Sequence, residues 1–306
     1  MIIRSAPNEL RRGGLRAKLD QEGFVRLIEA HDPLSAVVGE QTSVMRGRGV
    51  EKIEFDGFWS SSLTDSARRA LPDIELVGIR SRLERIAEIF AVTAKPLLMD
   101  GDTGGRPEHF EFAVRDLERA GVSGVVIEDK TGLKQNSLLG TEVSQTIADI
   151  DEFSDKIARG RAARSGDDFM IVARLESLIL ELGMDDALKR ASAYVDSGCD
   201  AIMIHSRRKV PDEVLEFAHR FRKSFPAVPL VSVPTSYNSI NAEQLREAGF
   251  NVVIYANHML RASMKAMSSV AESILVHDRT LEAEPYCSDV KDLLNIEVET
   301  PRTAAL

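Results

Sequence analysis

The chain has 306 residues, of which 43% are hydrophobic and 28% are charged, which is the composition of a globular protein with a large core. Its formal net charge of −9 argues against a nucleic acid or an anionic membrane as partner, although a local cluster of cations can still bind an anionic substrate. The 2 cysteines have no metal-binding spacing. The N-terminal residues do not resemble a signal peptide, and no apolar run approaches the roughly 20 residues that span a bilayer, so we expect a cytoplasmic protein.

Short apolar runs rich in Val, Ile and Leu recur along the sequence, and segments with helical spacing separate them. The runs, which we predict to be strands, lie at 24–32, 54–62, 95–105, 123–130, 169–176, 201–208, 229–236 and 251–258. The segments predicted to be helices lie at 34–45, 79–90, 108–121, 149–163, 184–198, 211–225, 241–249 and 259–275. Several of these segments end on Gly just before the next run, which is a common helix C-cap.

This alternation predicts the fold class. Continuous apolar strands that alternate with amphipathic helices indicate a parallel sheet covered by helices. The 8 units predict an α/β fold with a closed (β/α)8 barrel of the TIM type over residues 1–276. An open, doubly wound sheet is the alternative. Residues 277–306 are polar and acidic with one short helical pattern, so we predict a partly helical C-terminal appendage and not a second domain.

Carboxylates follow two neighbouring strands of the predicted barrel, at the end where such barrels carry their chemistry. Asp100 and Asp102 would share one face of a continuing strand, and Glu128 ends the next strand. Oxygen ligands without Cys or paired His suit Mg²⁺ or Mn²⁺ better than zinc. A solvated acidic rim is the other interpretation, because Asp is common in turns. We favour a metal site, since unpaired carboxylates at one barrel mouth would repel one another.

Candidate anion-binding groups lie at other strand ends. Arg174 and His205 end the two strands that follow Glu128. A guanidinium can hold a phosphoryl group with two hydrogen bonds, and an imidazole can donate to a phosphoryl oxygen. A structural ion pair and a core histidine are the alternatives, but the position opposite the carboxylates favours anion binding. Ser61, with the NH groups of Ser62 and Leu63, is a further candidate cradle for an anion.

A long segment joins the strand that ends in Glu128 to its helix, which we expect to begin near Asp149. The segment contains Lys134, Asn136 and Ser137 and is longer than most connections between a strand and a helix. Long loops at the mouth of a barrel are often lids that exclude water, and a plain surface loop is the alternative. We predict a lid.

The stretch EDKTGLKQNS at 128–137 resembles the EDK-x5-NS signature of phosphoenolpyruvate mutases, in the phosphoenolpyruvate mutase/isocitrate lyase superfamily. The stretches EAHDPLSA, WSSSL, LLMDGDTGG, IVARLESLI, DAIMIHSRR and VVIYANHMLRAS support the resemblance, which covers about residues 15 to 270. Lyases of the superfamily carry a catalytic cysteine in the loop that reads TGLKQNSLLG here. This loop has no cysteine, so we do not expect a lyase that acts through such a thiol.

The resemblance implies a Mg²⁺-dependent isomerase that interconverts phosphoenolpyruvate and phosphonopyruvate, which is the C–P bond-forming step of phosphonate biosynthesis. It implies that Asp100 binds the metal directly, while Asp73, Asp102 and Glu128 hold its waters. It also implies a homodimer or homotetramer in which barrels exchange their last helix.

The resemblance implies roles for the remaining residues. Ser61 and the NH groups of Ser62 and Leu63 would bind the pyruvyl end of the substrate, and Arg174 and His205 would bind the phosphoryl group. A gating loop would carry Lys134, Asn136 and Ser137. Of these, Asn136 would contact the phosphoryl group as it moves. Together with Asp73, Arg174 and His205, these lid residues are the catalytic candidates.

The chain departs from the mutase pattern at several places. Ser62 stands where mutases usually have glycine, and DTGGRPEH stands where mutases have a DTGYG continuation. TGL follows EDK where mutases usually have LFP. Thr131 is typical of phosphonopyruvate hydrolases, which lack the Asn-Ser pair present here. The main alternative is therefore a hydrolase that releases pyruvate and phosphate, or a related 2-oxo acid lyase or decarboxylase. A barrel without catalytic activity ranks last.

Overall fold

The computed structural model describes residues 2–3, 6–47 and 51–298. Parallel strands close into a barrel, and each strand pairs with the next one along the chain until the last pairs with the first. The strands are β2 (Val25–Glu29), β5 (Gly57–Ser60), β6 (Leu97–Asp100), β7 (Gly124–Glu128), β10 (Met170–Leu175), β11 (Ala201–Ile204), β12 (Leu230–Ser232) and β13 (Val252–Tyr255). The predicted (β/α)8 barrel is confirmed, and the open sheet is wrong.

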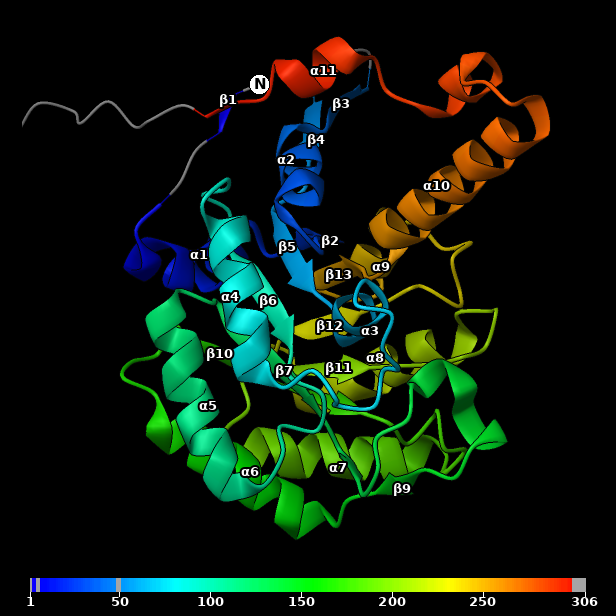
Figure 1. Cartoon of the computed structure of the whole chain (residues 1–306). Helices are drawn as coiled ribbons and strands as arrows, with labels where there is room; N and C mark the ends of the chain where they lie inside the picture. Colours follow the sequence, from blue (N-terminus) through cyan, green and yellow to red (C-terminus); the bar gives the residue numbers. More distant parts are fainter. Residues whose placement is uncertain (1, 4–5, 48–50, 299–306) are drawn as a thin grey trace, which may run out of the picture.

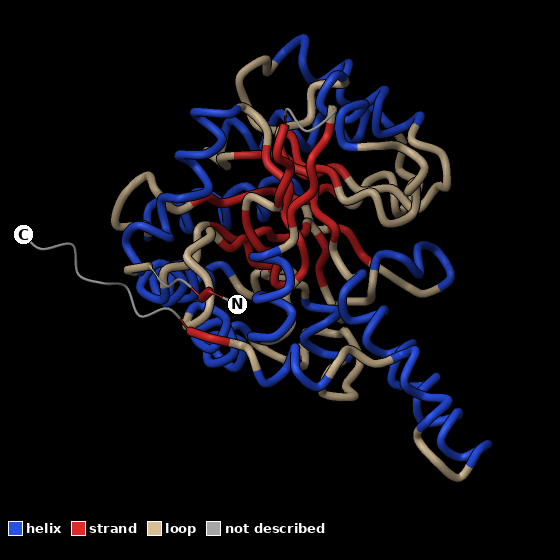
Figure 2. Tube along the Cα trace, turned by 90° about the horizontal axis from the view of Figure 1, so that it is seen from above, coloured by secondary structure: helices blue, strands red, loops and turns tan. Residues whose placement is uncertain are grey.

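Both faces of the barrel sheet are buried, which explains why its strands are continuous apolar runs. Alternate side chains point into the barrel and toward the helices. The inward set includes Leu98, Val126, Val172, Met203 and Ile254. The outward set includes Met99, Val125, Ile171, Ile204 and Val253. Figure 2 shows the strands gathered at the centre of the molecule with the helices around them.

Helices cover the outside of the barrel (Figure 1). They are α2 (Pro33–Gln41), α4 (Ile79–Phe90), α5 (Pro107–Ala120), α6 (Ile150–Ala163), α7 (Met184–Asp196), α8 (Asp212–Ser224) and α9 (Ala242–Glu247), with the short α3 (Ser62–Ala67) directly after β5. Helix α6 begins at the predicted place, because the Asp149 side chain accepts hydrogen bonds from the first free NH groups of the helix.

Two segments differ from the expected elements. The helix expected over 34–45 ends at Gln41, and the antiparallel strands β3 (Ser43–Arg46) and β4 (Glu51–Glu54) follow it. The sequence after Gln41 favours a strand because Thr42, Ser43 and Val44 have low helix propensity. Helix α1 (Asn8–Glu22) was not predicted, because its charges and two glycines hide the apolar side chains Leu15 and Leu19, which pack into the barrel interior.

The last barrel helix, α10 (His258–His277), projects away from the barrel in Figures 1 and 2. The chain then forms η2 (Leu281–Tyr286) and α11 (Val290–Leu294), and strand β14 (Glu297–Val298) pairs with β1 (Ile2–Ile3). The domain boundary between 276 and 277 stays a prediction, as does the exchange of α10 between subunits. Of the helices in the described part of the chain, none is long and apolar enough to cross a bilayer.

Candidate active site

The carboxyl ends of the barrel strands bring the predicted site residues around one small cavity of about 50 Å³. Lining this cavity are Ser61, Ser62, Leu63, Asp73, Asp100, Glu128, Lys134, Asn136, Ser137, Arg174 and His205. Asp102 lies just behind the lining, in contact with Lys134. The sequence analysis therefore identified the residues that the fold brings together, while their chemical roles stay predictions.

The two aspartates after β6 differ from the expected arrangement. Strand β6 ends at Asp100, and Asp102 has a φ of 54°, so the chain turns and the two side chains do not share one strand face. The Asp102 NH instead donates to Asp100 Oδ1 at 3.1 Å. Ser62 donates to Asp100 Oδ2 from its hydroxyl at 2.9 Å and from its NH at 3.3 Å. The Ser62 NH, a candidate for the predicted anion cradle, therefore donates to the Asp100 carboxylate.

Burial and the neighbouring charges give these two aspartates different pKa values. Burial opposes ionisation of Asp100, but the positive charges of Lys134 and Arg174 outweigh it and lower its pKa to about 2. Burial raises the pKa of Asp102 to about 6, and the neighbouring Asp100 charge adds to the rise. Of these two aspartates, Asp100 is therefore the one that is ionised throughout the physiological range.

Glu128, at the end of β7, is buried between two cations. Lys130 Nζ and Arg174 NH2 each lie 3.4 Å from one of its carboxylate oxygens, yet neither oxygen accepts a hydrogen bond. Burial raises the pKa of Glu128 to about 7. A buried carboxylate without a hydrogen-bond donor needs a further partner, such as a cation or its bound water.

The donor set around the cavity fits a hard divalent cation that keeps most of its waters. Its donors are carboxylate and hydroxyl oxygens, which Mg²⁺ prefers, and Mg²⁺ is typically bound by one or two carboxylates plus water. In the described residues, no three His, Cys, Asp or Glu side chains converge closely enough to ligate an ion together. Asp100 as the direct ligand, with water between the ion and Glu128, agrees with both observations.

Arg174 and His205 form a buried network with the lid residue Ser137. Arg174 donates to Glu176 at 2.6 Å and to the Ser137 hydroxyl at 2.6 Å, and Ser137 in turn donates to Glu176 at 2.6 Å. Lys130 Nζ donates to the same hydroxyl at 2.8 Å. Glu176 and Lys130 were not among the predicted site residues, although Glu176 directly follows β10, and a polar side chain at that place is a signal that would have found it.

His205 is neutral in this network. Burial and the nearby Arg174 charge lower the pKa of His205 to about 3. Its Nδ1 lies 3.1 Å from Arg174 NH2, which can only donate, so Nδ1 accepts and the proton resides on Nε2. The neutral imidazole can therefore still donate one hydrogen bond to an oxygen of a bound anion.

The lid runs between two short strands that pair with each other, β8 (Lys130–Thr131) and β9 (Thr146–Ile147), and contains the 3-10 segment η1 (Ser137–Glu142). This pairing fixes the two ends of the lid beside the barrel mouth. Inside η1, Gly140 has a φ of 52° and a ψ of −130°, a conformation that residues with a side chain rarely adopt.

The lid is closed over the cavity. Lys134 Nζ donates to Asp73 at 2.7 Å, to the Ser62 hydroxyl at 2.9 Å and to Asp102. Asn136 Nδ2 donates to Asp73 at 2.7 Å. Lys134 is 4% exposed, and its carboxylate neighbours keep its pKa above the usual value although burial opposes this. Asp73, which lies before α4, is thus the residue on which both lid side chains converge.

A buried basic layer on α4 lies behind the cavity. Arg82 is fully buried and donates to Asp65 at 2.5 Å and to the backbone carbonyl of Asp100. Arg85 donates to Ser60 and to Asp65, each at 2.7 Å. These contacts hold the ends of β5 and β6 in place. The sequence analysis missed them, because arginine in an amphipathic helix is normally exposed.

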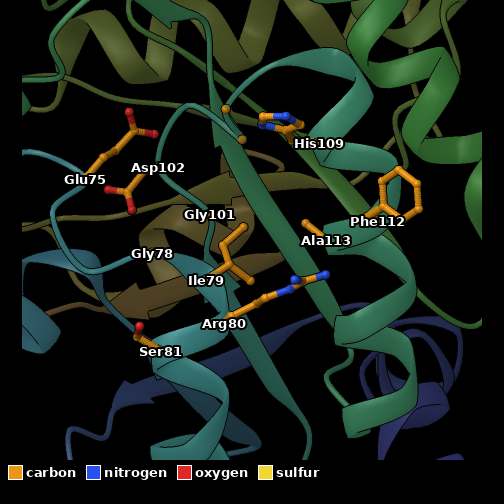
Figure 3. A pocket seen from close by; sticks show the side chains of 12 residues that line it. Glu75, Gly78, Ile79, Arg80, Ser81, Gly101, Asp102, His109, Phe112 and Ala113 are labelled. Atoms are coloured by element: carbon orange, nitrogen blue, oxygen red, sulfur yellow. The ribbon is translucent and has the colours of Figure 1, made fainter.

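A larger, open pocket of about 630 Å³ lies beside the site, between the loop after β6 and helices α4 and α5. Figure 3 shows Glu75 and Asp102 on one side of this pocket, with His109 and Phe112 on the other. Of the predicted site residues only Asp102 lines it. The pocket therefore borders the convergent site without sharing its chemistry.

Comparison with known proteins agrees with this geometry. The family model described as phosphoenolpyruvate phosphomutase matches residues 15–275. A phosphonopyruvate hydrolase of Variovorax sp. (strain Pal2) is 37% identical, over 92% of this chain and 93% of its own. A phosphoenolpyruvate phosphomutase structure from Streptomyces platensis subsp. rosaceus has a TM-score of 0.83 and 36% identity, over 92% of this chain and 93% of its own.

A solved phosphonopyruvate hydrolase in complex with oxalate and Mg²⁺ has a TM-score of 0.80 and 36% identity, and the match covers 93% of each chain. Mutases and hydrolases are thus similar to this chain to nearly the same degree, so overall identity does not separate the two activities. The match to the family model covers nearly the whole barrel, including the strand ends that carry the site. The chain belongs to the phosphoenolpyruvate phosphomutase family, and so to the phosphoenolpyruvate mutase/isocitrate lyase superfamily of enzymes.

Proposed function

We propose that this protein interconverts phosphoenolpyruvate and phosphonopyruvate by moving a phosphoryl group between the oxygen and C3 of pyruvate enolate. The observation that carries the proposal is the closed lid, in which Lys134 and Asn136 reach across the cavity to Asp73. A mutase needs such closure, because water that enters the site would capture the phosphoryl group. The Asn-Ser pair of the lid supports the same activity, since it belongs to the mutase signature that the chain resembles.

We propose Mg²⁺ as the cofactor, with Mn²⁺ as a substitute, held directly by Asp100 and through water by Asp73, Asp102 and Glu128. The Mg²⁺ in the solved hydrolase complex supports this assignment. When bound, the ion would stabilise the negative charge of the pyruvate enolate.

The protein's own groups would bind and orient the rest of the substrate. Ser61 and the Leu63 NH would hold the pyruvyl carboxylate, while Arg174 and the Nε2 proton of His205 would hold the phosphoryl oxygens. Asn136 would contact the phosphoryl group during its transfer. A loose, metaphosphate-like group needs fixed dipoles and no nucleophilic side chain, which fits a site without cysteine.

Hydrolysis of phosphonopyruvate is the second candidate. It is favoured by Thr131, which directly follows the EDK stretch, and by the 37% identity to the Variovorax hydrolase. In that case the same groups would bind the substrate, and the lid would admit one water molecule.

Phosphorus NMR of the purified protein with phosphonopyruvate and Mg²⁺ tests the proposal. We expect a phosphoenolpyruvate signal without inorganic phosphate. Asn136→Ala, which removes the lid contact with Asp73, should slow the conversion. Release of phosphate and pyruvate by the unaltered protein would replace the mutase by the hydrolase, and an unchanged spectrum would contradict both.

A further inference from the structure

The Ser62 hydroxyl lies between the lid and the carboxylate at the end of β6. Ser62 is the first residue of α3 and is 4% exposed. Its Oγ donates to Asp100 Oδ2 at 2.9 Å and accepts from Lys134 Nζ at 2.9 Å. A single atom therefore joins the lid to Asp100.

Only a hydroxyl at this position makes both contacts at once. The hydroxyl has one proton, with which it donates a hydrogen bond to the carboxylate, and lone pairs, which accept a hydrogen bond from the ammonium. Both hydrogen bonds involve an ionised partner and are stronger than bonds between neutral groups. The neighbouring NH of Ser62 also donates to Asp100, at 3.3 Å, so the residue is held on the carboxylate from two directions.

Lys134 makes this contact in addition to two ion pairs. Its other partners, Asp73 and Asp102, lie on the loops that precede α4 and follow β6. Without Ser62, the ammonium would still have these carboxylates but would lose its bond to the element that carries the Ser61 and Leu63 groups of the site. The Ser62 hydroxyl thus ties the lid to the same short helix that borders the substrate cavity.

We propose that Ser62 is a positioning residue that holds the lid closed, by accepting from Lys134 while it donates to Asp100. Loss of the hydroxyl opens the lid more often without removing any group that contacts the reacting atoms. The consequence for catalysis rests on the mutase activity proposed above: a lid that opens more often admits water, so phosphonopyruvate yields some inorganic phosphate. Lid opening itself is independent of that activity.

Hydrogen exchange of the backbone NH groups in residues 131–147 tests directly whether Ser62 holds the lid closed. It is measured on the full chain without substrate. Ser62→Ala keeps the NH and removes the hydroxyl, and we expect lid exchange to rise roughly tenfold, as for loss of a hydrogen bond to a charged group. Ser62→Thr keeps the hydroxyl and should restore slow exchange. Ser66→Ala removes an equally buried hydroxyl from the same helix and should leave lid exchange unchanged.

A double-mutant cycle tells whether Ser62 acts on the lid through Lys134 or independently of it. If Ser62 acts through Lys134, Lys134→Gln alone and Lys134→Gln with Ser62→Ala should open the lid to the same extent. Additive effects of the two substitutions would overturn the proposal, as would unchanged lid exchange in Ser62→Ala. If Ser62→Ala does not fold, as judged by circular dichroism, Ser62→Gly replaces it in the same comparison.

Product analysis completes the test. We expect the unaltered protein and Ser62→Thr to form only phosphoenolpyruvate from phosphonopyruvate. Release of phosphate by Ser62→Ala would support the proposal that the Ser62 hydroxyl holds the lid closed. An unaltered protein without mutase activity would overturn the proposed function. In that case the hydrogen exchange of the lid would still decide whether Ser62 holds the lid closed.

Discussion

Glu128 has an unusual environment for a buried side chain, because two cations lie near its carboxylate and no group donates to it. Burial without hydrogen bonds is what raises its pKa to about 7. In a protein without a further ligand, such a buried carboxylate would only lower the free energy of unfolding. A partner that binds at the barrel mouth would explain this carboxylate, and we propose that water on a divalent cation would supply the missing donors.

Glu128→Gln tests this at the residue scale. The variant keeps the shape of the side chain but removes the charge, so we expect the affinity for Mn²⁺ to fall roughly 10–100-fold, as for other groups that hold metal-bound water. Binding is measured by the electron paramagnetic resonance signal of free Mn²⁺.

Circular dichroism without metal checks that Glu128→Gln is folded, because the substitution also removes the ion pairs with Lys130 and Arg174. Glu118→Gln, at a buried glutamate that receives hydrogen bonds from Ser165, is the matched control and should bind Mn²⁺ normally. Equal Mn²⁺ affinity of Glu128→Gln and the unaltered protein would contradict a role in holding the ion.

The same scale shows what the sequence could predict. Residues that end apolar strands, such as Asp100 and Arg174, were identified because a parallel barrel places all strand ends at one mouth. The turn at Asp102 was not foreseen, because nothing in the letters DGDT specifies a positive φ at a residue other than glycine. Arg82 was missed for a different reason, since its burial depends on Asp65, which is distant in sequence and close only in the fold.

At the scale of elements, the lid is the long connection between β7 and α6, and its side chains line the cavity at the barrel mouth. The pairing of β8 with β9 fixes its ends, and the side chains between them reach both sides of the cavity. The length of this connection and its polar residues predicted a lid. The contacts on which closure depends could not be predicted, because Asp73 lies in a stretch without regular structure before α4.

Gly140→Ala tests whether the lid conformation matters for turnover. With a φ of 52° and a ψ of −130° at Gly140, alanine would strain the backbone, and its Cβ would lie 2.5 Å from Arg207 Nε. We expect kcat/KM to fall roughly tenfold or more, because strain of about 1–3 kcal/mol opposes the closed conformation.

The melting temperature of Gly140→Ala should change little, since the lid adds few apolar contacts to the barrel core. Gly166→Ala is the matched control, because an added Cβ meets no atom within 4 Å there. Unchanged kcat/KM in Gly140→Ala would mean that turnover does not need the closed conformation of η1.

At the scale of the whole molecule, α10 is a long helix that the barrel leaves largely uncovered. It has 20 residues, and among its described side chains only Ser273 is buried. The barrel holds the base of the helix, where Glu29 accepts from the Leu260 NH at 3.2 Å. Beyond this point α10 leaves the barrel, as Figures 1 and 2 show, and presents Met264, Met267 and Leu275 to the outside. The apolar pattern of 259–275 predicted a helix, but a pattern does not tell which surface covers it.

We propose that a second copy of the chain covers α10, as the resemblance to phosphoenolpyruvate mutases implies. A projecting helix with an exposed apolar face is unfavourable in water, and a homodimer would bury it on both copies.

Light scattering after size exclusion should therefore give two or four times the chain mass of 33.8 kDa. Replacing Met264 and Met267 together by lysine should shift the mass toward that of one chain, because buried lysines without partners oppose association. Leu10→Lys, at a leucine of α1 that is 71% exposed, should leave the mass unchanged. A single-chain mass for the unaltered protein would contradict the proposal that a second copy covers α10.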